Sequence, residues 1–157
     1  MSKAKAKTNS FDISAMATDV KKENEGVWHD YDGGLRLKIA RLNNEDHQQF
    51  MLEQRRKLNQ SQRFGVGGEI SKAELKRLTI EGMALHILVG WECMVEDGKT
   101  LAYSLEEAVR IITKYPKFFR LVEEEAMDDA NFKIESDADE LGNSESSATG
   151  TQDGGMP

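Results

Sequence analysis

The chain of 157 residues has little cysteine, little proline and no long apolar run. Its single cysteine, Cys93, excludes an intramolecular disulfide and a multi-cysteine metal site, and it fits a reducing compartment. The longest apolar run, residues 83–91, has nine residues and is interrupted by His86, whereas a membrane helix needs about 20. No apolar stretch follows the lysines at positions 3, 5 and 7, so we expect neither a secretory signal nor a membrane span.

The chain also lacks a surplus of basic residues. Its net charge is -7, and residues 134–157 contain six acidic and no basic residues. Residues 27–133 are close to neutral. Because a protein that binds duplex nucleic acid needs a basic face to displace counterions, we do not expect nucleic acid as the partner.

Apolar residues are sufficient for a core in only part of the chain. Leu, Ile, Val and Phe together number 34 of 157, just above the level of roughly 20% at which disorder becomes the default. From Ser136 onward the composition is too polar to offset the entropy of ordering. We therefore predict a flexible arm (1–25), a folded domain (26–135) and a disordered acidic tail (136–157). The arm's apolar group is expected to be loosely attached rather than docked; it comprises Phe11, Ile13, Met16 and Val20.

A β-hairpin is predicted at the start of the domain. Residues 27–31 and 35–42 flank Asp32-Gly33-Gly34, and glycine supplies the positive φ angles of a tight turn. In the second segment apolar and polar residues alternate, which is typical of a strand with one buried face. A lone hairpin is unstable in water, so it must pack on other elements.

Helices are predicted after the hairpin, each with a start signal. Asn44 is a candidate N-cap for a helix over 45–62. Ser71 with Glu74 forms a capping box for a central core helix that runs to Gly90. Gly65–Gly68 between these two helices is predicted to be a hinge rather than a phosphate-binding loop.

Two more helices follow a turn at Asp97-Gly98. Ser104 with Glu107 forms a second capping box, and Pro116 separates that helix from a last one that extends to about Ala130. The predicted fold class is therefore α+β, mainly α: an N-terminal β-hairpin followed by about four helices, with disordered termini.

No catalytic residues, cofactor site or metal site are assigned. His29 with Asp30 and Asp32, joined by His47 and Glu45, is the only metal-ligand combination considered, and acids near a turn are usually solvated. His86 is interpreted as a packed residue of the core helix. Cys93 lies beyond a helix C-terminus, which disfavours a thiolate. We therefore expect no enzyme.

Residues 26–133 resemble the tail assembly chaperones of long-tailed bacteriophages. The resemblance follows the order of several short segments; these are 26–28 (GVW), 35–44 (LRLKIARLNN), 90–91 (GW), 97–98 (DG), 103–108 (YSLEEA) and 115–116 (YP). It implies a non-catalytic protein that binds the tape measure protein, keeps it soluble and helps to recruit the tail tube protein. It also implies action in the host cytoplasm, absence from the mature virion and, in many relatives, a frameshifted extension.

The client would bind as an amphipathic helix in a groove between chaperone helices. The candidate contact residues are four aromatic side chains, with packing in the core as the alternative for each; they are Trp91, Tyr103, Phe118 and Phe119. Self-association on the client is left open. The alternative function is a small nucleic-acid-binding phage regulator that uses Arg55, Arg56 and Lys57.

Overall fold

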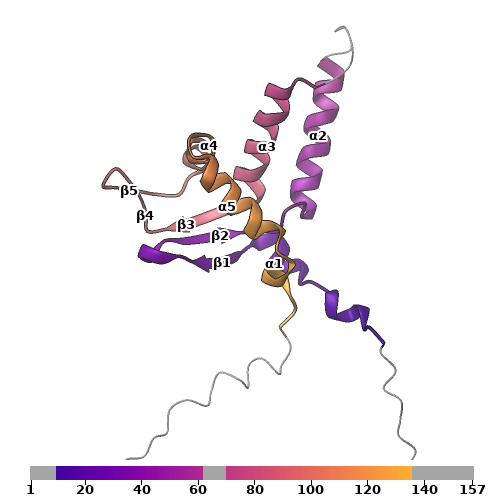
Figure 1. The fold of residues 1–157 in the computed structure, drawn as a ribbon. Helices are drawn as coiled ribbons and strands as arrows, with labels where there is room; N and C mark the ends of the chain where they lie inside the picture. Colours follow the sequence, from indigo (N-terminus) through magenta and orange to yellow (C-terminus); the bar gives the residue numbers. More distant parts are fainter. Residues whose placement is uncertain (1–9, 62–69, 136–157) are drawn as a thin grey trace, which may run out of the picture.

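The computed structural model describes residues 10–61 and 70–135 (Figure 1). The first nine residues, the predicted hinge at Gly65–Gly68 and the predicted tail (136–157) lie outside the described residues. In chain order the α-helices and strands are α1 (Val20–Glu25), β1 (Val27–Asp30), β2 (Arg36–Ile39), α2 (Glu45–Ser61), α3 (Lys72–His86), β3 (Leu88–Glu92), β4 (Met94–Glu96), β5 (Lys99–Leu101), α4 (Leu105–Lys114) and α5 (Pro116–Met127). Short 3-10 helices occur at Ile13–Met16, Asp32–Gly34 and Asp129–Phe132.

The predicted α+β class and the N-terminal hairpin are confirmed. Strands β1 and β2 pair antiparallel with Val27 opposite Ile39, and the Tyr31 amide donates to the carbonyl of Leu35 at 2.8 Å. At the turn Gly33 has φ 79° and Gly34 has φ 82°. Both angles lie in the left-handed region that favours glycine, which is why the chain reverses here.

The predicted end of the core helix is wrong. Helix α3 ends at His86 rather than Gly90, and residues 88–92 form strand β3, which pairs antiparallel with β2 in the order β1-β2-β3. Residues 87–91 are all apolar, and a short run of this kind does not distinguish a buried helix from a buried strand. The strand is favoured here because one edge of β2 would otherwise be unpaired. Pairing with residues 88–92 satisfies the backbone groups of that edge.

A second small hairpin extends the Asp97-Gly98 turn. Strands β4 and β5 pair antiparallel with Glu96 opposite Lys99, and Asp97 and Gly98 have φ angles of 48° and 78°. The sequence predicted the turn but not the strands. In Figure 1 this hairpin projects from the body beside α4.

The predicted helix starts are confirmed. The hydroxyls of Ser71 and Ser104 accept hydrogen bonds from the amides of Glu74 and Glu107, both at 3.1 Å. The side-chain Oδ1 of Asn44 accepts from the His47 amide at 2.9 Å and caps α2. At the other end of the domain α5 stops at Met127, and the following residues form a 3-10 turn.

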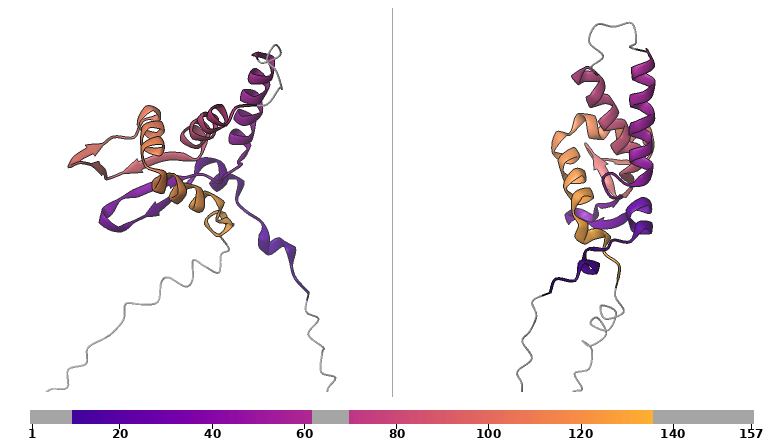
Figure 2. Two further views of the ribbon diagram at one scale, coloured as in Figure 1. Left: turned by 45° about the horizontal axis from the view of Figure 1, so that its top comes forward. Right: turned by 90° about the vertical axis from the view of Figure 1, so that its right-hand side faces the viewer.

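The core lies between one face of the three-stranded sheet and helices α3, α4 and α5 (Figure 2). Leu37 and Ile39 of β2 point into it. Helix α2 packs beside α3 as an antiparallel partner, and the two stand together at one end of the molecule (Figures 1 and 2). Within the described residues, no helix combines the length and the apolar character that crossing a bilayer requires.

The later part of the predicted arm is tied to the domain. Thr18 forms an antiparallel bridge with Lys133, and the Asp19 amide donates to the carbonyl of Phe132 at 2.7 Å. The arm's apolar group remains between 64% and 75% exposed; its members are Phe11, Ile13, Met16 and Val20.

Candidate functional site

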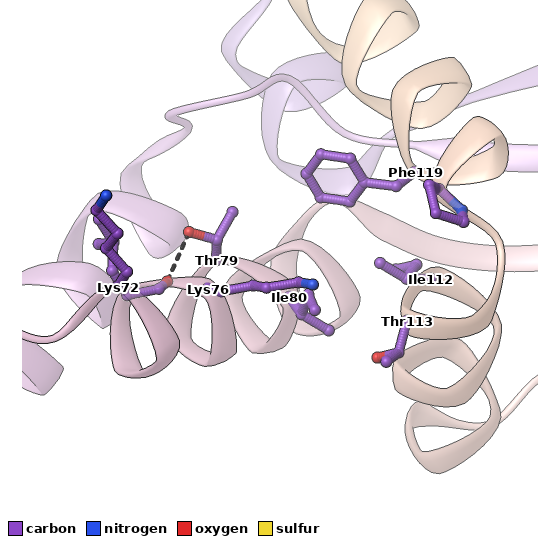
Figure 3. A pocket seen from close by; sticks show the side chains of 9 residues that line it. Lys72, Lys76, Thr79, Ile80, Ile112, Thr113 and Phe119 are labelled. Atoms are coloured by element: carbon purple, nitrogen blue, oxygen red, sulfur yellow. Dashed lines mark hydrogen bonds between the residues drawn. The ribbon is translucent and has the colours of Figure 1, made fainter.

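A hollow of about 380 Å³ lies where α3 faces the end of α4 and the start of α5 (Figure 3). We call it the α3–α5 groove. Most of its surface is apolar. The lining residues are Lys72, Leu75, Lys76, Thr79, Ile80, Ile112, Thr113, Pro116 and Phe119.

One wall of the groove is a single face of α3. Its five lining residues occupy positions i, i+3, i+4, i+7 and i+8 of the helix, which the helical period places on one side. Leu75 is 41% exposed there, whereas Leu78, on another face, is fully buried in the domain. The spacing of Leu75 and Leu78, three residues apart, predicts one buried stripe for both, and this is wrong for Leu75. Helix α3 therefore has two apolar faces, and one of them stays open.

The opposite wall comes from the junction of α4 and α5. Ile112 and Thr113 lie near the end of α4, Pro116 begins α5, and Phe119 follows one turn later. Figure 3 shows Ile80 and Ile112 on opposite sides of the hollow, with the ring of Phe119 extending over it. Pro116 has the fixed φ angle that suits the first position of a helix, so the turn between α4 and α5 is tight.

The groove offers few hydrogen-bonding groups. Thr79 and Thr113 donate their hydroxyl protons to the carbonyls of Leu75 and Val109 on their own helices, at 2.9 and 2.6 Å. At the rim the ammonium groups of Lys72 and Lys76 are the charged groups, and none of the described lining residues is acidic. The arrangement suits an apolar ligand with carboxylates at its border.

A second hollow of about 430 Å³ lies under the β4–β5 hairpin. Its lining includes Leu35, Met94, Leu101 and Phe118. Beside them, the Glu96 carboxylate accepts hydrogen bonds from side chains on or just after α4; the donors are Arg110 at 2.7 Å, Tyr115 at 2.6 Å and Lys114 at 2.9 Å. These donors, Arg110 foremost, hold the pKa of Glu96 well below its ordinary range. Glu96 therefore fastens the hairpin to α4.

The four predicted contact residues do not share one surface. Trp91 is only 5% exposed, and its indole N–H donates to the carbonyl of Leu101 at 2.8 Å. Tyr103 packs edge-on against Trp91 at 4.9 Å and donates to the carbonyl of Leu88. Phe119 lines the α3–α5 groove, and Phe118 lines the second hollow.

Sequence reasoning missed the α3 face of the groove. The spacing of Lys72, Leu75, Lys76, Thr79 and Ile80 was the available signal. This spacing is hard to recognise because the same helix carries a second, more apolar stripe, which is the one that packs inside the domain.

The three histidines do not form one cluster, since His29 lies beside Glu125 whereas His47 and His86 lie on helices α2 and α3. His29 Nδ1 is 3.4 Å from the carboxylate of Glu125, which also accepts from the hydroxyl of Tyr31 at 3.1 Å. Burial and this carboxylate raise the pKa of Tyr31. Burial, with a smaller effect of His86, lowers the pKa of His47. Within residues 10–61 and 70–135 no group of three or more His, Cys, Asp or Glu residues is placed to hold a metal ion.

Arg55, Arg56 and Lys57 are all exposed on α2. Consecutive helical positions are rotated by about 100° from one another, so the three cations point in different directions. Arg55 lies beside a shallow hollow that also includes Met51 and Leu52.

Comparison with known proteins identifies the family of the chain. The family model described as YdaY prophage protein matches residues 42–143, which include α2 to α5 and thus both walls of the groove. No curated protein matches the chain, and no solved structure does. Since the family model covers well over half of its length, the chain belongs to the YdaY prophage protein family.

Proposed function

We propose that this prophage protein is a tail assembly chaperone without catalytic activity. In this role it binds the tape measure protein of its phage in the host cytoplasm, keeps it soluble, helps to recruit tail tube subunits, and leaves before the virion is complete. Two findings support the proposal: membership of a prophage protein family, and the resemblance of residues 26–133 to tail assembly chaperones.

The α3–α5 groove is the structural observation that carries the proposal. Its α3 wall runs from Lys72 to Ile80, eight residue steps or about 12 Å along the helix. About two turns of a client helix fit along that length. A helix that places an apolar stripe in such a groove is an established mode of peptide recognition.

The chemistry of the client explains why an open apolar groove would be useful. Before the tube forms, the long helical segments of a tape measure protein have no partner for their apolar faces. Exposed apolar faces associate through the same burial that drives folding, so the free protein aggregates. Several chaperone copies along one client would bind with high avidity although each contact is weak. Weak individual contacts also allow release when tube subunits arrive.

Co-expression with the tape measure protein tests the proposal. The wild-type chain should raise the soluble yield of the tape measure protein and co-purify with it. Leu75→Glu places a charge in the groove at a side chain that is 41% exposed, so the domain should still fold while client binding is lost. Leu52→Glu on α2, at a position 60% exposed and outside the groove, is the matched control and should bind like wild type.

Two results of the co-expression experiment would contradict the proposal or its site. If the wild-type chain gives no gain in solubility and no co-purification, it is not a chaperone for this client. If Leu75→Glu and Leu52→Glu bind equally well, the client contact lies outside the groove.

A further inference from the structure

The N-terminal arm presents apolar side chains on an ordered turn. Phe11, Ile13 and Met16 are 75%, 73% and 64% exposed. The turn is fixed by Asp12, whose carboxylate accepts from the amide and the hydroxyl of Ser14 at 2.9 and 2.7 Å. Three large apolar side chains are thus held in solvent within six residues, and apolar groups gathered at a protein surface mark contact sites.

The arm leaves the domain from a fixed point that is far from its own groove. The bond from Asp19 to Phe132 anchors it beside the end of α5, whereas the groove lies at Pro116, where α5 begins. The twelve residues of α5 put about 18 Å between these two ends. Beyond the anchor, residues 10–17 project away from the body (Figures 1 and 2).

The turn and the rim of the groove carry opposite charges, although the arm as a whole (1–25) has five lysines and four acidic residues. Residues 11–20 contain Asp12 and Asp19 and no basic residue. The groove has Lys72 and Lys76 at its rim and no acidic side chain among its described lining residues. The chain therefore carries an apolar turn that includes the carboxylate of Asp12 and an apolar groove with a basic rim, and neither is covered in the structure.

We propose that the turn at Phe11–Met16 of one copy docks in the α3–α5 groove of a second copy. The apolar side chains enter the groove, and Asp12 lies near the lysines at its rim. With the turn intact, only Ala17 separates Met16 from Thr18, which is bridged to Lys133, so Met16 stays within about 7 Å of the anchor. The turn therefore stays clear of its own groove, about 18 Å away, and is free to meet the groove of a neighbouring domain. The contact is reciprocal in a closed dimer and head-to-tail in a longer assembly.

This inference goes beyond the proposed function, because arm docking needs no client and is measured on the purified chain alone. If the client also binds in the groove, the arm and the client compete for it. The arm would then cover the groove until a client displaces it, so that the free chaperone does not expose an apolar surface.

A complementation experiment with full-length chains tests the docking. One variant removes the apolar turn (Phe11→Ser, Ile13→Ser, Met16→Ser) and keeps the groove. The other, Leu75→Glu, blocks the groove and keeps the arm. We expect the wild type to show a molar mass above 17.6 kDa that rises with concentration in light scattering. Each variant alone should be monomeric, and an equimolar mixture of the two should form a heterodimer through the one intact arm–groove pair.

Controls separate docking from misfolding and from other contacts. Circular dichroism melts should show that both variants stay folded, since the altered side chains are exposed. Leu52→Glu should self-associate like wild type. A wild-type chain that is monomeric up to about 1 mM overturns the proposal, whether its arm is free or folded onto its own groove. Self-association that survives removal of the apolar turn, or a mixture that stays monomeric, overturns it as well.

Discussion

Asn44 joins three segments of the chain through one buried amide. Only 3% of the residue is exposed. Its oxygen accepts from the His47 amide, and its Nδ2 group donates to the carbonyls of His86 and Glu23 at 3.0 and 3.4 Å. The residue thus caps α2 and holds the end of α3 and the end of α1 beside it.

Asn44→Ala should lower the free energy of unfolding by about 3 kcal/mol, because it removes a cap worth about 1 kcal/mol and leaves buried carbonyls without this donor. Ser71→Ala removes a cap only, at an exposed helix start, and should cost about 1 kcal/mol. Urea denaturation of the two variants gives the comparison. Equal losses would show that the bonds to His86 and Glu23 contribute nothing measurable.

His47 makes stability depend on pH. Burial lowers its pKa in the folded protein below the ordinary value of about 6.5, so the unfolded chain takes up the proton first as the pH falls. The stability contributed by the neutral, packed ring is therefore complete above about pH 6.5 and is lost as the pH falls toward the folded pKa.

The drop in denaturation midpoint between about pH 7.5 and 5.5 should accordingly be smaller in His47→Gln than in wild type. The prediction compares slopes, so a lower absolute stability of the variant does not affect it. Gln48→Ala, an exposed neighbour on α2, serves as control and should keep the wild-type slope. Parallel pH profiles for wild type and His47→Gln would assign the dependence to other groups.

At the scale of elements, the β1–β2 hairpin depends on its glycines. A side chain at Gly33 would have nothing within 4 Å, so a substitution there tests backbone strain alone. Gly33→Val places a β-branched residue at φ 79° and should cost about 1–2 kcal/mol. Gly33→Asn should cost less, since asparagine tolerates this region. An unchanged midpoint in Gly33→Val would mean that the turn re-forms, for example around Gly34.

The elements predicted correctly from the sequence are those fixed by local chemistry. Glycine at positive φ sets the two turns, and Ser71, Ser104 and Asn44 set three helix starts. Strand β3 could not be predicted in this way, because its conformation depends on the edge of β2, about fifty residues earlier in the chain. Long-range pairing has no signature within the strand itself.

In the candidate site, too, local sequence indicates the place of some residues, while the place of others depends on the rest of the fold. The aromatic character of Phe119 makes it a candidate contact residue, and it lines the groove. Trp91 and Tyr103 are also aromatic, and they pack against each other, with Trp91 5% exposed and Tyr103 37% exposed. Aromatic character alone does not distinguish a core position from a surface position. Burial depends on which elements of the domain cover the residue. Leu75 and Leu78 differ in burial although they are three residues apart on one helix.

At the scale of the whole molecule, charge and apolar surface are separated. The net charge is -7, with most of the acidity near the C-terminal end of the chain, while the groove has a rim of two lysines. The acidic run from Glu123 to Asp129 is partly engaged inside the domain, since Glu125 accepts from Tyr31 and Asp129 pairs with Arg41. The groove therefore combines open apolar surface with a charge opposite to that of the molecule.

This separation predicts how binding of the tape measure protein responds to salt. Burial of apolar side chains in the groove does not weaken as ionic strength rises, whereas exposed ion pairs are largely screened at about 0.5 M salt. Pull-down of the co-expressed proteins should thus survive about 0.5 M salt with at most a modest loss from the lysines at the rim. The double variant Lys72→Gln/Lys76→Gln should bind the tape measure protein equally well at low and at high salt. Lys99→Gln, on β5 away from the groove, is the matched control. Binding that disappears at high salt would keep the partner but reject the groove as the main contact, and it would move the interaction to exposed carboxylates such as Glu124 of the acidic run.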